Sequence, residues 1–77
     1  MDETQEEMLE KLHPATKDIL RFFEYRHLSP KLQAVSEMFS NLAYALVFDF
    51  ELTGPEVTVS LRKLLEAKDC AVRAALG

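Results

Sequence analysis

The sequence has few of the residues that cross-link or bend a small protein: one cysteine, two glycines, three prolines and no tryptophan among 77 residues. A single cysteine, Cys70, excludes an intramolecular disulfide. The sequence also lacks an apolar run long enough to span a bilayer, and it shows no signal peptide. We therefore expect a protein of a reducing, intracellular compartment that has no membrane partner.

Motifs of catalysis and metal binding are absent as well. His13, His27 and Cys70 lack the close paired spacing of a zinc site. No glycine-rich phosphate loop, nucleophile elbow or His-Glu helix motif occurs. We expect no enzymatic activity, no metal and no cofactor. Each histidine is interpreted as a turn residue, and Cys70 as a small packed side chain.

Acidic residues outnumber basic ones, thirteen to nine, which gives a net charge of −4. A protein that binds duplex nucleic acid needs a basic surface that releases counterions, so this balance argues against such a partner. The acids gather at the start, where the first ten residues hold five acids and no base. We treat residues 1–14 as an acidic N-terminal segment, helical or frayed, and residues 15–77 as one helical domain.

The N-terminal third favours two short helices. Met1–Leu12 has amphipathic spacing, and a His-Pro pair interrupts it. Thr16 and Asp18 then offer a cap for a second short helix near Lys17–Tyr25.

The first long helix is expected from Pro30 to about Phe50. Ser29 is a favoured N-cap, and proline is favoured as a first helical residue because its missing N–H has no partner there. Apolar residues recur at spacings of three and four, which predicts a seam that faces another helix. The seam consists of Leu32, Val35, Phe39, Leu42 and Leu46, and Met38, Ala45 and Phe48 widen it.

The sequence LTGPE breaks this helix, and a second long helix is expected from Pro55 to about Leu76. Both helices should be roughly 30 Å long at 1.5 Å per residue, so the short turn predicts a matched antiparallel hairpin. The expected fold class is all-α, an antiparallel two-helix hairpin preceded by a short N-terminal helix. The apolar side of the second helix carries Val57, Leu61, Leu64, Leu65, Ala71, Val72 and Ala75.

Apolar residues around the first long helix exceed what one partner helix can cover, since Met38, Phe48 and Phe50 lie around its circumference. A chain this short buries only about 60% of its unfolded surface, so we expect a helical homo-oligomer. The alternative is a monomeric three-helix bundle, in which the short helix with Phe22 and Phe23 folds back and covers the whole face.

The segment EYRHLSPKLQ, Glu24–Gln33, sets a tyrosine, an arginine and a histidine in front of the Pro30 helix start. Free N–H groups and the positive end of the helix dipole favour an anion there. Arg26 adds a fork-shaped cation, and Tyr25 adds a flat ring. The simpler interpretation is that water solvates this helix start and that Tyr25 belongs to the core.

The segment LRKLLEAKDCAVRAAL, residues 61–76, is the second unusual stretch. Lys68 falls on the apolar side of the helix, where a buried ammonium group needs an acid, a carbonyl or a phosphate as partner. Arg73 lies four residues after Asp69, and that pair can be an ordinary surface contact. The alanines beside Arg73 would let helices of several chains converge and leave a shallow basic pocket.

Together these stretches resemble a family of bacteriophage proteins. The pattern runs aromatic-x-Tyr-x-His-Leu-Ser-Pro, then Leu-Gln-x-Val-Ser and, after a Gly-Pro-Glu turn, Thr-Val-x-Leu-Arg-Lys-Leu-Leu-Glu-Ala-Lys-Asp-x-Ala-Val-Arg-Ala. It is similar to the anti-CBASS protein two family, whose hairpin is related to that of Thoeris anti-defence protein one. The resemblance covers about Phe22 to Leu76.

The resemblance implies a sponge: a helical hexamer of two interlocked trimers that binds cyclic oligonucleotide messengers without cleaving them, in the cytoplasm of the infected bacterial host. A cyclic dinucleotide would lie between helices of two protomers, with a base on Tyr25. Ser40 stands where family members carry a lysine, and a hydroxyl makes a weaker phosphate contact than an ammonium group. The implied site residues are Tyr25, Arg26, His27, Leu28, Ser36 and Ser40.

The resemblance also implies a separate site for cyclic trinucleotides on the threefold axis. Arg73 and Ala74 match its region, and Lys68 or Thr58 could assist. Three symmetry-related arginines would gather three phosphates. The competing function is a small helical protein–protein interaction or adaptor module with an acidic tail. Composition and helices fit that function equally well, but it does not explain the Tyr25 corner or Lys68.

Overall fold

The computed structural model describes residues 4–77, without the side chains of Gln5 and Glu6. The described residues form helices joined by short connections and contain no strand, which confirms the all-α class. The elements are α1 (Gln5–Lys11), α2 (Pro14–Leu20), the 3-10 turn η1 (Arg21–Phe23), α3 (Pro30–Tyr44), the π-helical turn η2 (Ala45–Asp49) and α4 (Pro55–Leu76).

Helix α1 begins after Thr4, whose Oγ1 accepts a hydrogen bond from the Glu7 N–H at 3.2 Å. It accounts for the later part of the predicted Met1–Leu12 helix, and residues 1–3 lie outside the described residues. Its apolar side chains Met8 and Leu9 pack against the core, as does Leu12 at its C-cap.

Helix α2 begins at Pro14, because His13 provides the cap: its Nδ1 accepts from the Ala15 N–H at 3.1 Å. The prediction that Thr16 and Asp18 cap this helix is wrong. Thr16 already lies within α2 and is buried, so its hydroxyl faces the protein interior rather than a helix end. The proline at the first helical position, where an N–H would lack a partner, moved the start three residues earlier than predicted.

Helix α3 begins at Pro30, as predicted. Ser29 has the extended backbone of an N-cap, with φ −64° and ψ 158°, but its side chain makes no capping hydrogen bond. After Tyr44 the helix widens into η2, where the Phe50 N–H donates to the Ala45 carbonyl at 2.9 Å. The helical segment therefore reaches its predicted end near Phe50.

Helix α4 has the predicted bounds, Pro55–Leu76, and the turn before it has two residues with positive φ. Gly54 has φ 96°, which costs a glycine little. Glu51 has φ 52°, in the left-handed region that a side chain disfavours. The turn thus carries some backbone strain at Glu51.

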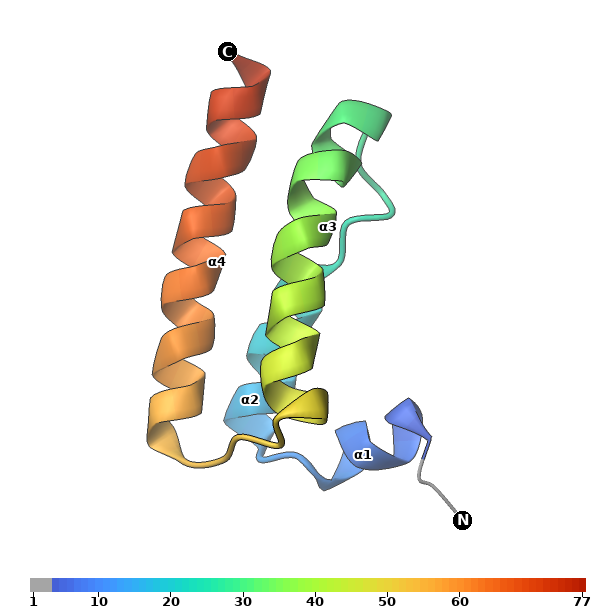
Figure 1. The fold of residues 1–77 in the computed structure, drawn as a ribbon, viewed down its shortest axis with the longest axis vertical. Helices are drawn as coiled ribbons and strands as arrows, with labels where there is room; N and C mark the ends of the chain where they lie inside the picture. Colours follow the sequence, from blue (N-terminus) through green and yellow to red (C-terminus); the bar gives the residue numbers. More distant parts are fainter. Residues whose placement is uncertain (1–3) are drawn as a thin grey trace.

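Helices α3 and α4 lie side by side and run in opposite directions, and the turn that joins them is at the bottom of the view in Figure 1. The segment of α2 and η1 packs against both long helices, and α1 lies near the turn. The C-terminus of α4 is at the end of the molecule far from the turn. The two ends of α4 therefore lie at opposite ends of the molecule, and the predicted site residues Thr58 and Arg73 are near different ends.

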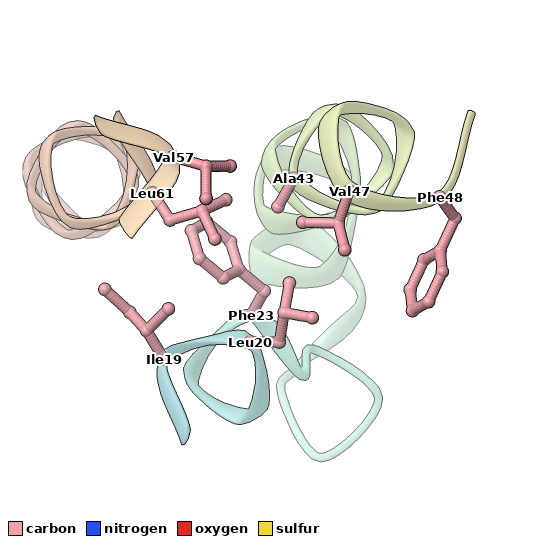
Figure 2. Packing of buried hydrophobic residues seen from close by; sticks show 8 residues of the cluster. All are labelled: Ile19, Leu20, Phe23, Ala43, Val47, Phe48, Val57 and Leu61. Atoms are coloured by element: carbon pink, nitrogen blue, oxygen red, sulfur yellow. The ribbon is translucent and has the colours of Figure 1, made fainter. Parts of the chain in front are cut away.

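The core lies in the half of the molecule near the turn. Leu20 and Phe23 point from the α2–η1 segment into the space between α3 and α4, and Phe48 lies apart from them at the edge (Figure 2). Phe23, Leu20 and Leu61 are fully buried, and complete burial of such a side chain contributes roughly 1.5–3 kcal/mol. The core residues are Ile19, Leu20, Phe23, Ala43, Val47, Phe48, Val57 and Leu61.

The predicted seam of α3 is confirmed only in part: Phe39 and Leu46 pack against the core, but mostly small residues take the buried positions. The buried residues of this stretch are Ser36, Ser40, Ala43, Val47 and Phe48, and the first four recur at spacings of four, three and four. Small side chains let α4 and η1 approach α3 closely. The larger residues of the predicted seam lie on its flanks, where they are half-buried or, in the case of Leu42, 48% exposed.

The α2–η1 segment folds back as the monomeric alternative supposed, but it does not cover the apolar surface of the chain. Met38, on α3, is 73% exposed, and Phe50, directly after η2, is 69% exposed. Phe22, which the monomeric alternative placed on the covering helix, is itself 52% exposed. A single chain therefore presents a substantial apolar surface to its surroundings.

Candidate functional site

A polar hollow of about 280 Å³ lies where the loop after η1 passes along α3. Figure 1 shows this loop, residues 24–29, at the side of α3 away from α4. The loop and the helix contribute three lining residues each: Glu24, Tyr25 and Arg26 from the loop, and Ser40, Asn41 and Tyr44 from α3.

Hydrogen bonds to the backbone give the loop its shape. The Leu28 N–H donates to the Tyr25 carbonyl at 3.0 Å, which closes a turn directly after the tyrosine. The side-chain amide of Gln33, on the first turns of α3, donates to the Leu28 carbonyl at 2.7 Å and to the Arg26 carbonyl at 3.4 Å. Gln33 was not predicted as a site residue, yet it fastens the loop to the helix.

Glu24 and Arg26 form a two-pronged ion pair at the edge of the hollow. Arg26 Nε donates to Glu24 Oε1 at 3.0 Å, and Arg26 Nη2 donates to Oε2 at 2.9 Å. The backbone N–H groups of Tyr25 and Arg26 also donate to Oε1, at 3.0 and 2.9 Å. One carboxylate thus accepts four hydrogen bonds from the two residues that follow it.

These bonds fix the charges at the hollow. The Arg26 side-chain and backbone hydrogen bonds lower the pKa of the Glu24 carboxyl from its usual 4.5 to about 2, and the Tyr25 N–H adds to the effect. The same carboxylate raises the pKa of Arg26. Glu24 is therefore anionic and Arg26 cationic at any physiological pH, and the pair is solvent-exposed, with 44% and 79% of the two side chains accessible.

The two tyrosines of the hollow are both half-buried. Tyr44 stacks on Phe48, with ring centroids 5.5 Å apart and an interplanar angle of 28°. That packing holds one ring of the hollow in place, and Tyr25 presents the other from the loop. The hollow thus brings two tyrosine rings together with a guanidinium, an amide, a hydroxyl and the Glu24 carboxylate. An aromatic ring can stack on a flat base, and a guanidinium binds an anionic phosphate.

The structure brings together three of the six residues predicted for a cyclic dinucleotide: Tyr25, Arg26 and Ser40 line the hollow. His27 is exposed and Leu28 half-buried, and neither lines it. Ser36 is fully buried, and its hydroxyl has no hydrogen-bond partner among the described residues. Glu24, Asn41 and Tyr44 were missed, although Tyr44 follows Ser40 by four residues and Asn41 by three, spacings that place it beside both on the helix.

The four residues predicted for a cyclic trinucleotide are spread along α4. Arg73 and Ala74 are exposed on its last turns, and Arg73 Nη2 donates to Cys70 Sγ at 3.3 Å. Thr58 lies in the first turns, about 22 Å away at 1.5 Å per residue, and its hydroxyl is 3.3 Å from that of Thr16. Within one chain these residues do not form a single site.

The environments of Lys68 and Cys70 can also be compared with what the sequence predicted for them. Lys68 is 8% exposed, and its Nζ donates to the Phe22 carbonyl at 2.6 Å and lies 6.0 Å from the centroid of the Phe23 ring. A carbonyl is thus the partner that the buried ammonium group requires. Cys70 is exposed, so the prediction that it is a packed side chain is wrong.

A larger hollow of about 370 Å³ lies at the turn between α3 and α4. Its described lining is mostly apolar and includes no arginine or lysine, so it does not complement an anion: His13, Ala15, Thr16, Gly54, Pro55, Thr58 and Val59. The smaller hollow beside Tyr25 is therefore the better candidate for a ligand that carries phosphate, despite its size.

Comparison of the chain with protein-family models, curated proteins and solved structures finds no match. Within residues 4–77, no group of His, Cys, Asp and Glu side chains is placed to hold a metal ion. None of the helices that the structure describes has the length and apolar character of a membrane span.

Proposed function

We propose that this chain is a non-catalytic sponge for cyclic oligonucleotide messengers, and that it acts in the cytoplasm of an infected bacterial host. The observation that carries the proposal is the polar hollow, where Tyr25 and Arg26 meet Ser40, Asn41 and Tyr44. A base would stack on Tyr25, and a phosphate would lie against Arg26. The resemblance to the anti-CBASS protein two family supports the same ligand class.

The size of the hollow supports a site shared between two protomers. Its volume of about 280 Å³ lies below the roughly 300–1,000 Å³ of pockets that enclose a drug-sized ligand. A cyclic dinucleotide has two bases and two phosphates, so one hollow suffices for part of it. A second protomer would supply the remaining walls.

The oligomer that such sharing needs is supported by the uncovered apolar surface. Met38 and Leu42 are exposed on α3, and Phe50 is exposed just after η2. Burial of apolar area contributes about 25 cal/mol per Å², so contact between copies would cover these residues at a substantial gain. We propose a hexamer of helical hairpins, the assembly that the family resemblance implies.

Binding of cyclic trinucleotides is proposed for Arg73 and Ala74. Both are exposed at the end of α4, and in the proposed oligomer several chains would converge there around an axis. Lys68 and Thr58 each have a hydrogen-bond partner within the chain, Phe22 and Thr16 respectively. We therefore rest this part of the proposal on Arg73 and Ala74 alone.

Isothermal titration calorimetry with a panel of cyclic di- and trinucleotides tests the proposal. The expected result is saturable heat with at least one cyclic compound and much weaker heat with the linear dinucleotide of the same bases. Chromatography of the ligand after release from heat-denatured protein should return it unchanged, since a sponge does not cleave its ligand.

Heat with no cyclic compound would overturn the proposal. A self-associating protein without ligand heat would favour the adaptor or interaction module, because the exposed apolar surface serves that function equally. Recovery of cleaved ligand would contradict the non-catalytic part.

A further inference from the structure

The loop before α3 contains an anion-binding arrangement that is already filled by the chain itself. Four donors converge on one group: the N–H groups of Tyr25 and Arg26, and Nε and Nη2 of Arg26. All four bonds are 2.9–3.0 Å long. The group that they hold is the carboxylate of Glu24, the residue directly before them.

A phosphate would use the same donors. Paired anionic oxygens of a carboxylate or a phosphate accept equally from the fork of an arginine, and successive backbone N–H groups form a small anion-binding concavity. The Glu24 carboxylate therefore occupies donors that a phosphate would otherwise use. Because it is anionic at physiological pH, a ligand phosphate cannot occupy these donors until the carboxylate leaves.

The pair is exposed, which makes displacement possible. Arg26 has 79% of its side chain accessible and Glu24 has 44%, so neither is locked by packing. An exposed ion pair changes an equilibrium constant by up to about fivefold. A ligand that also stacks a base on Tyr25 gains more than this, whereas a bare anion does not.

We infer that Glu24 is a specificity-determining residue that competes with the ligand phosphate for Arg26 and the adjacent N–H groups. This inference rests on the proposed function, since it assigns a selection rule to the same hollow. An anion that carries only a phosphate does not displace the Glu24 carboxylate from its donors. A ligand that carries a phosphate and a base displaces it, because the base also stacks on Tyr25. Removal of its charge should therefore strengthen binding, the opposite of what loss of a contact residue does.

Glu24→Gln tests the inference, with Glu37→Gln as the matched control. Glu37 is exposed on α3, three residues before Ser40 and four before Asn41, so it lies on the helix face of the hollow and loses the same charge. Calorimetry uses the cyclic dinucleotide that binds best to the unaltered protein. The expected gain is about fivefold for Glu24→Gln and less than about twofold for Glu37→Gln at 0.15 M salt.

A second arm uses pyrophosphate, an anion without a base. Titration to millimolar concentration should shift the NMR signals of the Tyr25 and Arg26 amides in Glu24→Gln and leave them unmoved in the unaltered protein. In an Arg26→Gln background, Glu24→Gln should bring a smaller gain with either probe, because only the two backbone N–H groups remain as donors. A matching thermal unfolding curve for each variant shows that the fold is kept.

The outcomes separate the inference from the proposed function. If cyclic dinucleotides bind the unaltered protein and Glu24→Gln equally well, the inference is overturned and the sponge proposal stands. If pyrophosphate shifts the two amides in Glu24→Gln while no cyclic compound binds any variant, competition by Glu24 is supported and the sponge proposal falls. Absence of binding by every probe overturns both.

Discussion

Lys68 Nζ donates to the Phe22 carbonyl at 2.6 Å and thereby joins two residues that are 46 positions apart in the sequence. The bond ties the middle of α4 to η1, three residues before Tyr25. It also explains why a lysine occupies the apolar side of α4, since the ammonium group has found a carbonyl partner and lies 6.0 Å from the Phe23 ring centroid. The position of the loop that carries Tyr25 thus depends on α4.

Lys68→Met should lower the free energy of unfolding by about 1–3 kcal/mol, because the Phe22 carbonyl loses a charge-assisted hydrogen bond that methionine cannot replace. Hydrogen exchange of residues 22–28 should accelerate more than exchange in the second half of α4. Urea unfolding and exchange mass spectrometry measure the two effects.

Lys63→Met is the control for Lys68→Met, because Lys63 is exposed on the same helix and its loss should change stability by less than about 0.5 kcal/mol. Loss of cyclic trinucleotide binding in Lys68→Met, with stability and exchange unchanged, would contradict the anchoring role and restore Lys68 to the trinucleotide site.

The bounds of the long helices could be predicted because they depend on local signals. Pro30 and Pro55 each occupy a first helical position, where a missing N–H costs nothing, and a glycine with positive φ precedes the second. The start of α2 was predicted three residues too late. Pro14 occupies its first helical position as well, but the residue before it is a histidine, which is not among the strongest capping residues.

The buried face of α3 could not be predicted from the sequence, because periodicity identifies apolar residues and not the distance between helices. Ser36 and Ser40 face inward since small side chains permit close approach, and the large apolar residues lie at the flanks. The lining of the hollow could likewise be predicted only in part, because it depends on how the loop lies against α3. Tyr25 and Arg26 were visible beside a helix start, whereas Tyr44 and Asn41 join them only once the loop lies along α3.

Self-association should depend on the exposed apolar residues of α3. Leu42→Glu adds a charge to a side chain that is 48% exposed in the single chain and would be desolvated between copies. Light scattering should return an oligomer for the unaltered protein and a mass close to 8.8 kDa for the variant. Thr53→Glu, in the exposed turn, adds the same charge and should leave the mass unchanged. A mass near 8.8 kDa for the unaltered protein at micromolar concentration would refute the oligomer.

Glu51→Gly should stabilise the protein by about 0.5–1 kcal/mol. Glu51 has φ 52°, where a side chain costs about 1–2 kcal/mol, and part of the gain is lost to the greater freedom of glycine in the unfolded chain. Asp49→Gly, two residues earlier within η2, should instead destabilise by a similar amount. Urea midpoints at one protein concentration measure both, and equal shifts of the same sign would show that strain at Glu51 is not the cause.

Tyr25→Ala should weaken cyclic dinucleotide binding by about 1–3 kcal/mol, the range for loss of one stack between a base and an aromatic ring. Tyr25→Phe keeps the ring and should retain most of the affinity. Calorimetry measures both variants, and light scattering checks their assembly. Dissociation of the oligomer by Tyr25→Ala would show that this half-buried ring belongs to the core and not to a ligand site.

Arg73→Glu should abolish cyclic trinucleotide binding and leave dinucleotide binding intact. Arg73 is exposed near the end of α4, and three introduced carboxylates around one axis would face three phosphates, where like charges repel strongly in a partly desolvated pocket. The described contact of Arg73 is Cys70 Sγ at 3.3 Å, a weak acceptor that a phosphate can replace. Arg62→Glu, an exposed arginine nearer the other end of the helix, is the control and should leave both affinities unchanged. Titration of each variant with both ligand classes decides the matter: unchanged trinucleotide affinity in Arg73→Glu would remove the axial site from the proposal, and parallel loss of both ligands would show that the helix end, rather than one pocket, has been damaged.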